Sequence, residues 1–292
     1  MIDSTRLASF IAFAEELNFT RAAARLHISQ PALHVQIRKL ADEIGAPLYR
    51  RVGRALQLSP QGRELLGFGR ELRERTENFL SVLAGGGPHR VTLAAGEGTL
   101  LYALGSAIRK AAQQPGLKLS VLTRDREGTL AALASAEAHL GVTALEVVPE
   151  HLEARLLRRA GMLLVMPHGH RLTRKRRLKL ADLQDERLIV PPPGHRHRQV
   201  VARALESAGV DWEVALEANG WELMLQYATL GMGLAIVNDI CRIPRAAAAR
   251  PITGIPSVGY FVLHGRRLGL SEPAQLVRQL IVETFSDHSP SA

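Results

Sequence analysis

The chain has 292 residues, enough for two or three domains with sizeable cores. Its apolar fraction of 46% is ordinary for a globular protein, and no run of about twenty apolar residues could cross a membrane. The net charge of +9 suggests a polyanionic partner. The single cysteine, Cys241, excludes an internal disulfide and a cysteine-based zinc cluster. The first residues lack the pattern of a secretory signal, so we expect a cytoplasmic protein.

Two short helices with almost nothing between them are predicted near the N-terminus. Thr20 is expected to cap the first and Ser29 the second, because a hydroxyl oxygen there accepts a backbone N–H of the first turn. Pro31 is tolerated in that first turn. Only His27 and Ile28 separate the two helices, so they must cross steeply. This is the helix-turn-helix geometry, which places the start of the second helix in the DNA major groove.

Apolar residues at helical spacing support this interpretation on both sides. A preceding helix is predicted from Leu7, Phe10, Ala14 and Leu17, and the second motif helix carries Leu33, Ile37, Leu40 and Ile44. Gly45 should end that helix. The next residues, 48–58, predict two extended arms about a turn that contains Gly53, a basic wing suited to lie against phosphates. The alternative is a three-helix bundle with a solvated basic hairpin.

These segments resemble the signature of the LysR-type bacterial transcriptional regulators. The resemblance runs through residues 20–26, 29–33, 36–40, 48–51 and 58–62. His34 departs from the family's usual serine and Ala41 from its usual glutamate. We expect Gln30 and His34 to face base edges and the arginines to face phosphates. The expected DNA-binding residues are Thr20, Ser29, Gln30, Pro31, Ala32, His34, Arg38, Arg50, Arg51 and Arg54.

A long helix is predicted over residues 59–83, because Ser59 and Pro60 form a strong helix start. Leu65, Leu72 and Phe79 are seven residues apart, which indicates a self-association seam with a second copy of the helix. The alternative is that this helix lies on its own C-terminal domain.

The pattern of predicted secondary structure changes after a glycine-rich hinge at residues 84–90. Strands and helices then alternate, which predicts an α/β domain with parallel strands. Strands are expected at 90–95, 117–123, 140–143, 161–167, 188–190, 233–237 and 260–263, and helices at 98–113, 128–138, 198–209, 220–230 and 273–285.

The expected fold class is α+β multidomain: a winged helix-turn-helix, a long linker helix, and a two-lobed α/β effector domain like a periplasmic binding protein. The LysR-type resemblance extends weakly over this second part. The predicted domains are 1–58, the linker helix 59–83, the hinge 84–90 and the effector-binding domain 91–292, with lobe I at 91–162 and 265–292 and lobe II at 163–264.

A ligand cleft is predicted at the carboxyl ends of the strands, where helix N-termini also lie. Its expected lining, which matches positions of the LysR-type cleft, is Glu97, Gly98, Thr99, Arg124, Asp125, Thr143, Pro193, Gly194, His195, Arg196, Asn219, Trp221 and Val237. Thr99 and nearby N–H groups suit an anionic group, with His195 and Arg196 as further donors. This mixture favours a small polar effector that carries a carboxylate. Any one of these residues could equally belong to an ordinary loop.

Other motifs predict less. Gly96-x-Gly98 lacks the third glycine of a dinucleotide site, and Gly231-x-Gly233 lacks the lysine of a phosphate loop. His195-x-His197 could ligate a metal only with partners that the sequence does not show. Cys241 has no second cysteine for redox sensing. The basic run at 171–179 is typical of a solvated loop rather than a second nucleic-acid site.

The sequence therefore predicts a ligand-responsive, DNA-binding transcriptional regulator, with no catalytic residues, metal or cofactor. The resemblance implies a dimer that pairs into a tetramer, binding double-stranded DNA at an interrupted inverted repeat, with RNA polymerase as a possible partner and a nucleoid location. The rival hypotheses are a solute-binding protein of the same two-lobed shape and an enzyme fused to a DNA-binding module.

Overall fold

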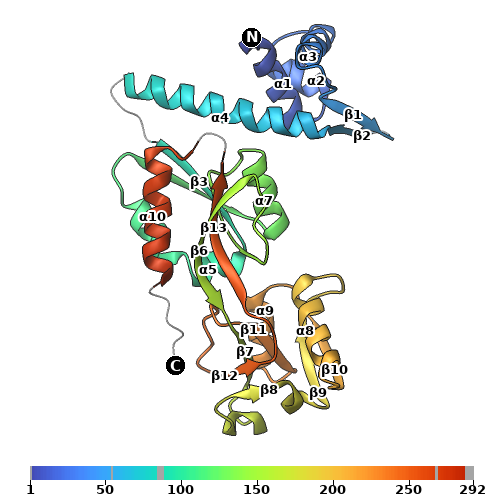
Figure 1. Ribbon diagram of the computed structural model, residues 1–292, viewed down its shortest axis with the longest axis vertical. Coiled ribbons are helices and arrows are strands. Elements are labelled where there is room, and N and C mark those ends of the chain that lie inside the picture. Colours follow the sequence, from blue (N-terminus) through green and yellow to red (C-terminus); the bar gives the residue numbers. More distant parts are fainter. Residues whose placement is uncertain (1, 54, 84–88, 267–268, 287–292) are drawn as a thin grey trace.

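The computed structural model describes residues 2–53, 55–83, 89–266 and 269–286. An N-terminal head sits on one end of a long helix, and two α/β lobes follow on the other side of that helix (Figure 1). The predicted wing residue Arg54 and most of the predicted hinge, residues 84–88, lie outside the described residues.

The head contains three helices and a two-stranded hairpin: α1 (Ser4–Glu16), α2 (Phe19–Arg25), α3 (Gln30–Ile44), β1 (Tyr49–Val52) and β2 (Ala55–Leu58). Its core is formed by the apolar positions that recur at helical spacing, with Phe10, Leu33 and Leu40 fully buried. β1 and β2 pair antiparallel from Tyr49 opposite Leu58 to Val52 opposite Ala55, which confirms the predicted wing.

The caps of the motif helices were predicted correctly at α3 and wrongly at α2. The Ser29 hydroxyl accepts a hydrogen bond from the Ala32 N–H at 3.3 Å, and Gly45 ends α3 with a φ of 75°. Thr20 does not cap α2, because the helix begins at Phe19, two residues before the start that a Thr20 cap would give, and Phe19 is buried. Asn18 is the cap, and its side-chain oxygen accepts from the Arg21 N–H at 3.1 Å.

Helix α4 (Pro60–Leu83) begins as expected, with the Ser59 hydroxyl accepting from the Gly62 N–H at 2.9 Å. The expectation that Leu65 shares a free stripe with Leu72 and Phe79 is wrong. Leu65 is buried in the core of the head, because the first turns of α4 pack against α1. Leu72 and Phe79, further along the helix, are 42% and 62% exposed.

The middle of α4 also contacts the first α/β lobe, so the alternative of a helix resting on its own C-terminal domain holds for this part. The Arg70 guanidinium donates to the Ser135 carbonyl oxygen at 3.0 Å. A Cβ at Gly67 would stand 2.8 Å from the Ala134 carbonyl oxygen, so glycine is required for this close approach.

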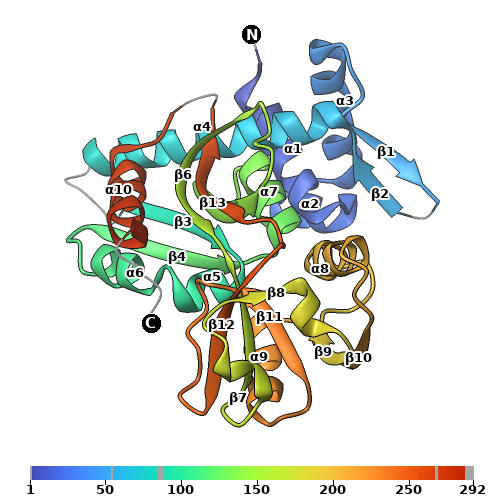
Figure 2. The same ribbon diagram turned by 60° about the horizontal axis from the view of Figure 1, so that its bottom comes forward.

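The first lobe is a five-stranded sheet of order β4-β3-β5-β13-β6. Its strands are β3 (His89–Ala95), β4 (Leu117–Thr123), β5 (Leu140–Leu145), β6 (Leu152–Ala160) and β13 (Val258–Gly265). Its helices are α5 (Glu97–Tyr102), α6 (Gly105–Ala112), α7 (Arg126–Ala134) and α10 (Glu272–Ser286). α6 and α10 cover one face and α7 the other (Figure 2). The predicted single helix over 98–113 is two helices, broken at Ala103 and Leu104.

The second lobe is a six-stranded sheet of order β10-β9-β11-β7-β12-β8. Its strands are β7 (Met162–Pro167), β8 (Leu178–Lys179), β9 (Glu186–Val190), β10 (Trp212–Glu217), β11 (Leu234–Asn238) and β12 (Ala247–Thr253). Two 3₁₀ turns, Arg171–Arg174 and Leu180–Leu183, and the helices α8 (Arg196–Ser207) and α9 (Trp221–Thr229) complete it.

Two sequence predictions about the lobes need correction. Both sheets are mixed rather than parallel, since β13 runs antiparallel to β5 and β6, and β7 runs antiparallel to β11 and β12. Lobe II does not extend to residue 264, because β13 belongs to the first sheet. The strands β6, β8, β10 and β12 were not predicted from the sequence.

The chain passes between the lobes twice. Gly161 alone separates β6 from β7, and residues 254–257 return from β12 to β13. β6 and β13 run side by side toward the second lobe in both views (Figures 1 and 2). No helix among the described residues is long and apolar enough to cross a membrane.

Candidate functional site

The start of α3 presents polar side chains at the surface of the head. Gln30, Pro31 and His34 are exposed, and Ala32 is half-buried. The Thr20 hydroxyl donates to the Gln30 side-chain oxygen at 3.2 Å, so the missed cap residue instead orients the first side chain of α3. The Gln30 amide can then present its N–H groups outward.

His34 is held in place by an aromatic neighbour. Its ring stacks on Phe19 with centroids 3.6 Å apart and planes 15° apart, while its edge remains exposed. Phe19 in turn stacks on Phe13 in the core of the head at 4.2 Å. The imidazole is therefore presented on a rigid apolar base, a geometry that favours directional hydrogen bonding over a flexible contact.

The positively charged side chains of the head fall into two groups, those held in ion pairs and those without an ion-pair partner. Arginines of α1 and α2 are held in ion pairs with carboxylates of the head: Arg6 with Glu43, Arg21 with Glu16, and Arg25 with Glu15. Within the described part of the head, the cations without an ion-pair partner are Arg38, Lys39, Arg50 and Arg51. All four lie on α3 or the wing and are exposed. The free charge therefore lies on the elements that carry Gln30 and His34.

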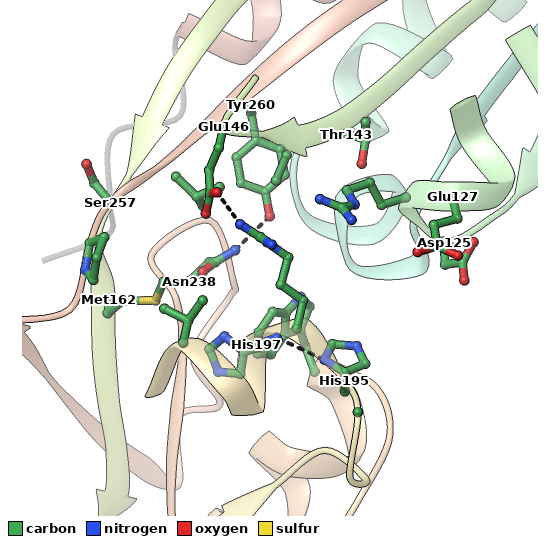
Figure 3. A pocket seen from close by; sticks show the side chains of 18 residues that line it. Asp125, Glu127, Thr143, Glu146, Met162, His195, His197, Asn238, Ser257 and Tyr260 are labelled. Atoms are coloured by element: carbon green, nitrogen blue, oxygen red, sulfur yellow. Dashed lines mark hydrogen bonds and ion pairs between the residues drawn. The ribbon is translucent and has the colours of Figure 1, made fainter. Parts of the chain in front are cut away.

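A second candidate site is a cavity of about 370 Å³ between the lobes (Figure 3). Six of the predicted cleft residues line it: Asp125, Thr143, Gly194, His195, Arg196 and Trp221. The helices α7 and α8 supply its charged wall, because Asp125 caps α7 and Arg196 begins α8. The cavity is adjacent to the crossing strands, since Met162 of β7 and Val258 of β13 also line it.

The other seven predicted residues do not line this cavity: Glu97, Gly98, Thr99, Arg124, Pro193, Asn219 and Val237. Thr99 is buried, and its side chain interacts with the Tyr260 hydroxyl instead of facing a ligand. Val237 points into the core because side chains alternate along β11. Arg124 is held by Glu137 at 3.0 Å. Gly98 lies behind the cavity wall, where a Cβ would stand 2.4 Å from the Trp221 ring.

Sequence reasoning missed Glu127, Glu146 and Tyr260, which line the cavity together with Asn238, the neighbour of the predicted Val237. The Asn238 amide donates to the Tyr260 hydroxyl at 2.8 Å, and burial raises the pKa of that hydroxyl above its usual value. The alternation along β11 offered a signal for Asn238, since a buried Val237 places its neighbour on the opposite face. Tyr260 lies on β13, a strand that the sequence analysis places in lobe II although it belongs to the sheet of the first lobe.

The histidines of the cavity are neutral at ordinary pH. Burial lowers the pKa of His197 to about 4, although its Nε2 lies 2.8 Å from the Ile236 carbonyl oxygen. Burial also lowers the pKa of His195, against the attraction of Asp125. A neutral His195 can still donate one ring N–H, as expected, whereas Arg196 and Arg126 supply the positive charge of the lining.

The described residues also include potential metal ligands and one cysteine. No group of three or more His, Cys, Asp or Glu side chains there could hold a metal ion. Cys241 is buried, and burial raises the pKa of its thiol well above the usual value, which disfavours the reactive thiolate.

Comparison with known proteins gives matches along the whole chain. Residues 4–63 match the family described as bacterial regulatory helix-turn-helix protein, lysR family, and residues 84–286 match the LysR substrate binding domain. A probable hydrogen peroxide-inducible genes activator of Mycobacterium avium is 30% identical over 269 residues, 90% of this chain and 86% of that protein. A RuBisCO operon transcriptional regulator of Allochromatium vinosum is 29% identical over 239 residues, 80% and 78% of the two chains.

Solved structures show the same fold. Full-length OxyR from Pseudomonas aeruginosa superposes with a TM-score of 0.71 at 20% identity, covering 98% of this chain and 95% of that one. CbnR complexed with its target DNA gives a TM-score of 0.56 at 20% identity, covering 97% and 99%. The two family matches follow the boundary between head and lobes, and the relatives are transcriptional regulators. The chain therefore belongs to the LysR family of ligand-responsive bacterial transcriptional regulators.

Proposed function

We propose that this regulator binds an interrupted inverted repeat as a dimer of dimers and responds to a small, polar, carboxylate-bearing effector in the cavity between its lobes. The observation that carries the DNA half is the segregation of charge in the head. Its free cations lie on α3 and the wing, next to Gln30 and His34.

The side chains of the head have two proposed roles, base recognition and phosphate contact, which follow from their chemistry. Gln30 and His34 offer hydrogen bonds that can distinguish base edges in the major groove. Arg38, Arg50 and Arg51 offer charge to phosphates, which adds affinity without reading sequence. One head covers one half-site, so a repeat requires two heads at fixed spacing.

The effector half rests on the position of the cavity. It lies between two lobes joined by two crossing segments, and its lining comes from both. A ligand that contacts both lobes prefers one lobe arrangement, and it shifts the equilibrium by that preference. Because α4 contacts the first lobe through Arg70, a lobe movement can reach the heads.

The remaining parts of the proposal concern assembly and partners. Leu72 and Phe79 are exposed on α4 and provide an apolar surface for a second copy. We place the protein in the cytoplasm, associated with the nucleoid, with RNA polymerase as a further partner. Because the relatives are named as regulators of transcription, we infer that this protein is not an enzyme.

Selection of binding sites from random double-stranded DNA tests this function. The full chain should enrich a two-fold symmetric site with an unconserved centre, and a variant with Gln30→Ala and His34→Ala should lose the enriched sequence while still retaining DNA at low salt. Enrichment of no sequence, or of the same sequence by that variant, would show that α3 does not read DNA in this way.

A further inference from the structure

An ion pair joins the two lobes across the mouth of the cavity. Arg196 is the first residue of α8 in the second lobe, and Glu146 follows the end of β5 in the first. The Arg196 guanidinium contacts the Glu146 carboxylate directly. Figure 3 labels Glu146 on the opposite side of the cavity from His195 and His197. The ion pair links one side chain of each lobe.

The same pair also lines a more open groove of about 650 Å³. Four residues line both spaces: Glu146, Arg196, Val200 and Pro256. The pair therefore lies on the border between the inner cavity and the outer groove.

A buried polar atom inside the cavity lacks a partner. Asn238 is 5% exposed, and its Nδ2 donates a hydrogen bond to the Tyr260 hydroxyl oxygen. Its Oδ1 accepts no hydrogen bond from any described residue. A buried acceptor left unpaired costs free energy, so a bound molecule that supplies an N–H or O–H would be favoured there.

We propose that Glu146 occupies the anion-binding position of Arg196 in the ligand-free protein, and that the carboxylate of the effector takes its place. The same effector carries a hydrogen-bond donor that pairs with Asn238. This inference rests on the proposed function for the identity of the cavity as the effector site. It names the effector class as a small organic acid that carries a hydroxyl, amide or ammonium group.

The exposure of the pair makes this exchange feasible. The Arg196 and Glu146 side chains are 44% and 60% exposed, and ion pairs so open to water are weak. The released Glu146 can be solvated at the cavity mouth. The cleft then exchanges one carboxylate on Arg196 for another, while the donor of the effector pairs with the Asn238 Oδ1.

The exchange can be tested without knowing the natural effector. Trp221 lines the cavity, whereas Trp212, the other tryptophan, lies on β10 and serves as an internal reference. The full chain is labelled with 5-fluorotryptophan, and the fluorine resonance of Trp221 is followed during titration with acetate and with neutral acetamide.

Glu146→Gln should lower the acetate Kd about two- to fivefold, the strength expected for an exposed pair, and leave acetamide unaffected. Glu127→Gln is the matched control, because it removes one carboxylate from the same lining without freeing Arg196. The double variant Glu146→Gln/Arg196→Gln should lose the gain. An unchanged acetate Kd in Glu146→Gln, or an equal gain in Glu127→Gln, would overturn the exchange.

The proposed hydrogen bond from an effector hydroxyl to the Asn238 Oδ1 is tested in the Glu146→Gln variant, with hydroxy acids and their unsubstituted parent acids. Glycolate, 3-hydroxypropanoate and 4-hydroxybutanoate are compared with acetate, propanoate and butanoate. At least one hydroxy acid should bind more tightly than its parent, and Asn238→Ala should remove that advantage. If none binds more tightly, Asn238 is not the donor's partner. Neither titration contains DNA, so failure here leaves the DNA-binding function untouched.

Discussion

Arg70 of α4 donates a hydrogen bond to the Ser135 carbonyl oxygen at 3.0 Å while its Nε lies 3.3 Å from the Glu15 carboxylate. One side chain therefore connects the first lobe with α1 of the head. Burial raises the pKa of Glu15, but hydrogen bonding from Arg25 and the charges of Arg70 and Arg73 outweigh it and leave that pKa lowered. Glu15 thus stays ionised and keeps Arg70 positioned toward the lobe.

Arg70→Ala should loosen the contact between α4 and the first lobe. Loss of one charge-assisted hydrogen bond is worth about 1–3 kcal/mol. Hydrogen exchange at residues 134–138 should accelerate, and the effect of a ligand on DNA affinity should shrink. Arg73→Ala is the control, because Arg73 reaches Glu15 at 3.5 Å and forms no described bond to the lobe. Equal acceleration in both variants would argue against a specific role for Arg70.

Gln30→Ala should weaken binding to the selected site by about 1–3 kcal/mol and binding to random DNA very little, because a base-edge contact is lost. Arg51→Ala should weaken both alike and reduce the slope of log K against log salt concentration by about one. Fluorescence anisotropy titrations at several salt concentrations measure both effects. Equal losses on both DNAs for Gln30→Ala would refute the assignment.

Leu72→Lys places a charge on the exposed apolar surface of α4, in a groove that Leu7 and Ile11 of α1 also line. We expect dissociation into monomers in sedimentation velocity and loss of specific binding, since half-site pairing needs two heads. Leu230→Lys is the control, because Leu230 is 63% exposed but lies in the second lobe. A Leu72→Lys protein that remains dimeric would mean that copies associate elsewhere.

Gly98→Ala should disturb the cavity wall. The added Cβ would stand 2.4 Å from the Trp221 ring, so α5 and α9 must separate at a cost of about 1–3 kcal/mol. Gly105→Ala, where nothing lies within 4 Å, should be neutral or stabilising by up to about 1 kcal/mol. Chemical denaturation compares the two. The Trp221 fluorescence maximum should shift only in Gly98→Ala.

Stability should fall between pH 6.5 and 4 because of His197. Its pKa is lowered from 6.5 to about 4 in the folded state by burial, so in this range the unfolded chain binds a proton that the folded chain does not. The loss is complete near pH 4 and amounts to about 3 kcal/mol at most. His197→Gln should flatten this part of the stability profile, measured by urea unfolding. His151→Gln, at an exposed position, should leave it unchanged.

The head could be predicted almost entirely from the sequence, since its signals are local. Ser29, Gly45 and the Ser59-Pro60 pair each act within one helical turn, and the wing is set by adjacent residues. Leu17, expected on the buried face of the first helix, is instead 38% exposed beyond the end of α1. The capping error, Thr20 for Asn18, is a shift of two residues at a helix start. It arose because Phe19 is drawn into the core of the head, which no capping rule describes.

The lobes were decided by contacts between distant residues. β6, with the sequence LEARLLRRA, has the composition of a helix, yet it pairs along its whole length with β13 about a hundred residues later. That pairing places β13 in the first lobe and Tyr260 against Asn238.

The sequence by itself determined the DNA-binding head and the alternating character of the rest, because capping, turn chemistry and apolar periodicity operate between near neighbours. Only the tertiary structure decided that Leu65 is buried, that Thr99 faces Tyr260, and that Arg196 meets Glu146. Strand order and lobe packing set which distant side chains meet, and a single strand sequence is compatible with several such arrangements.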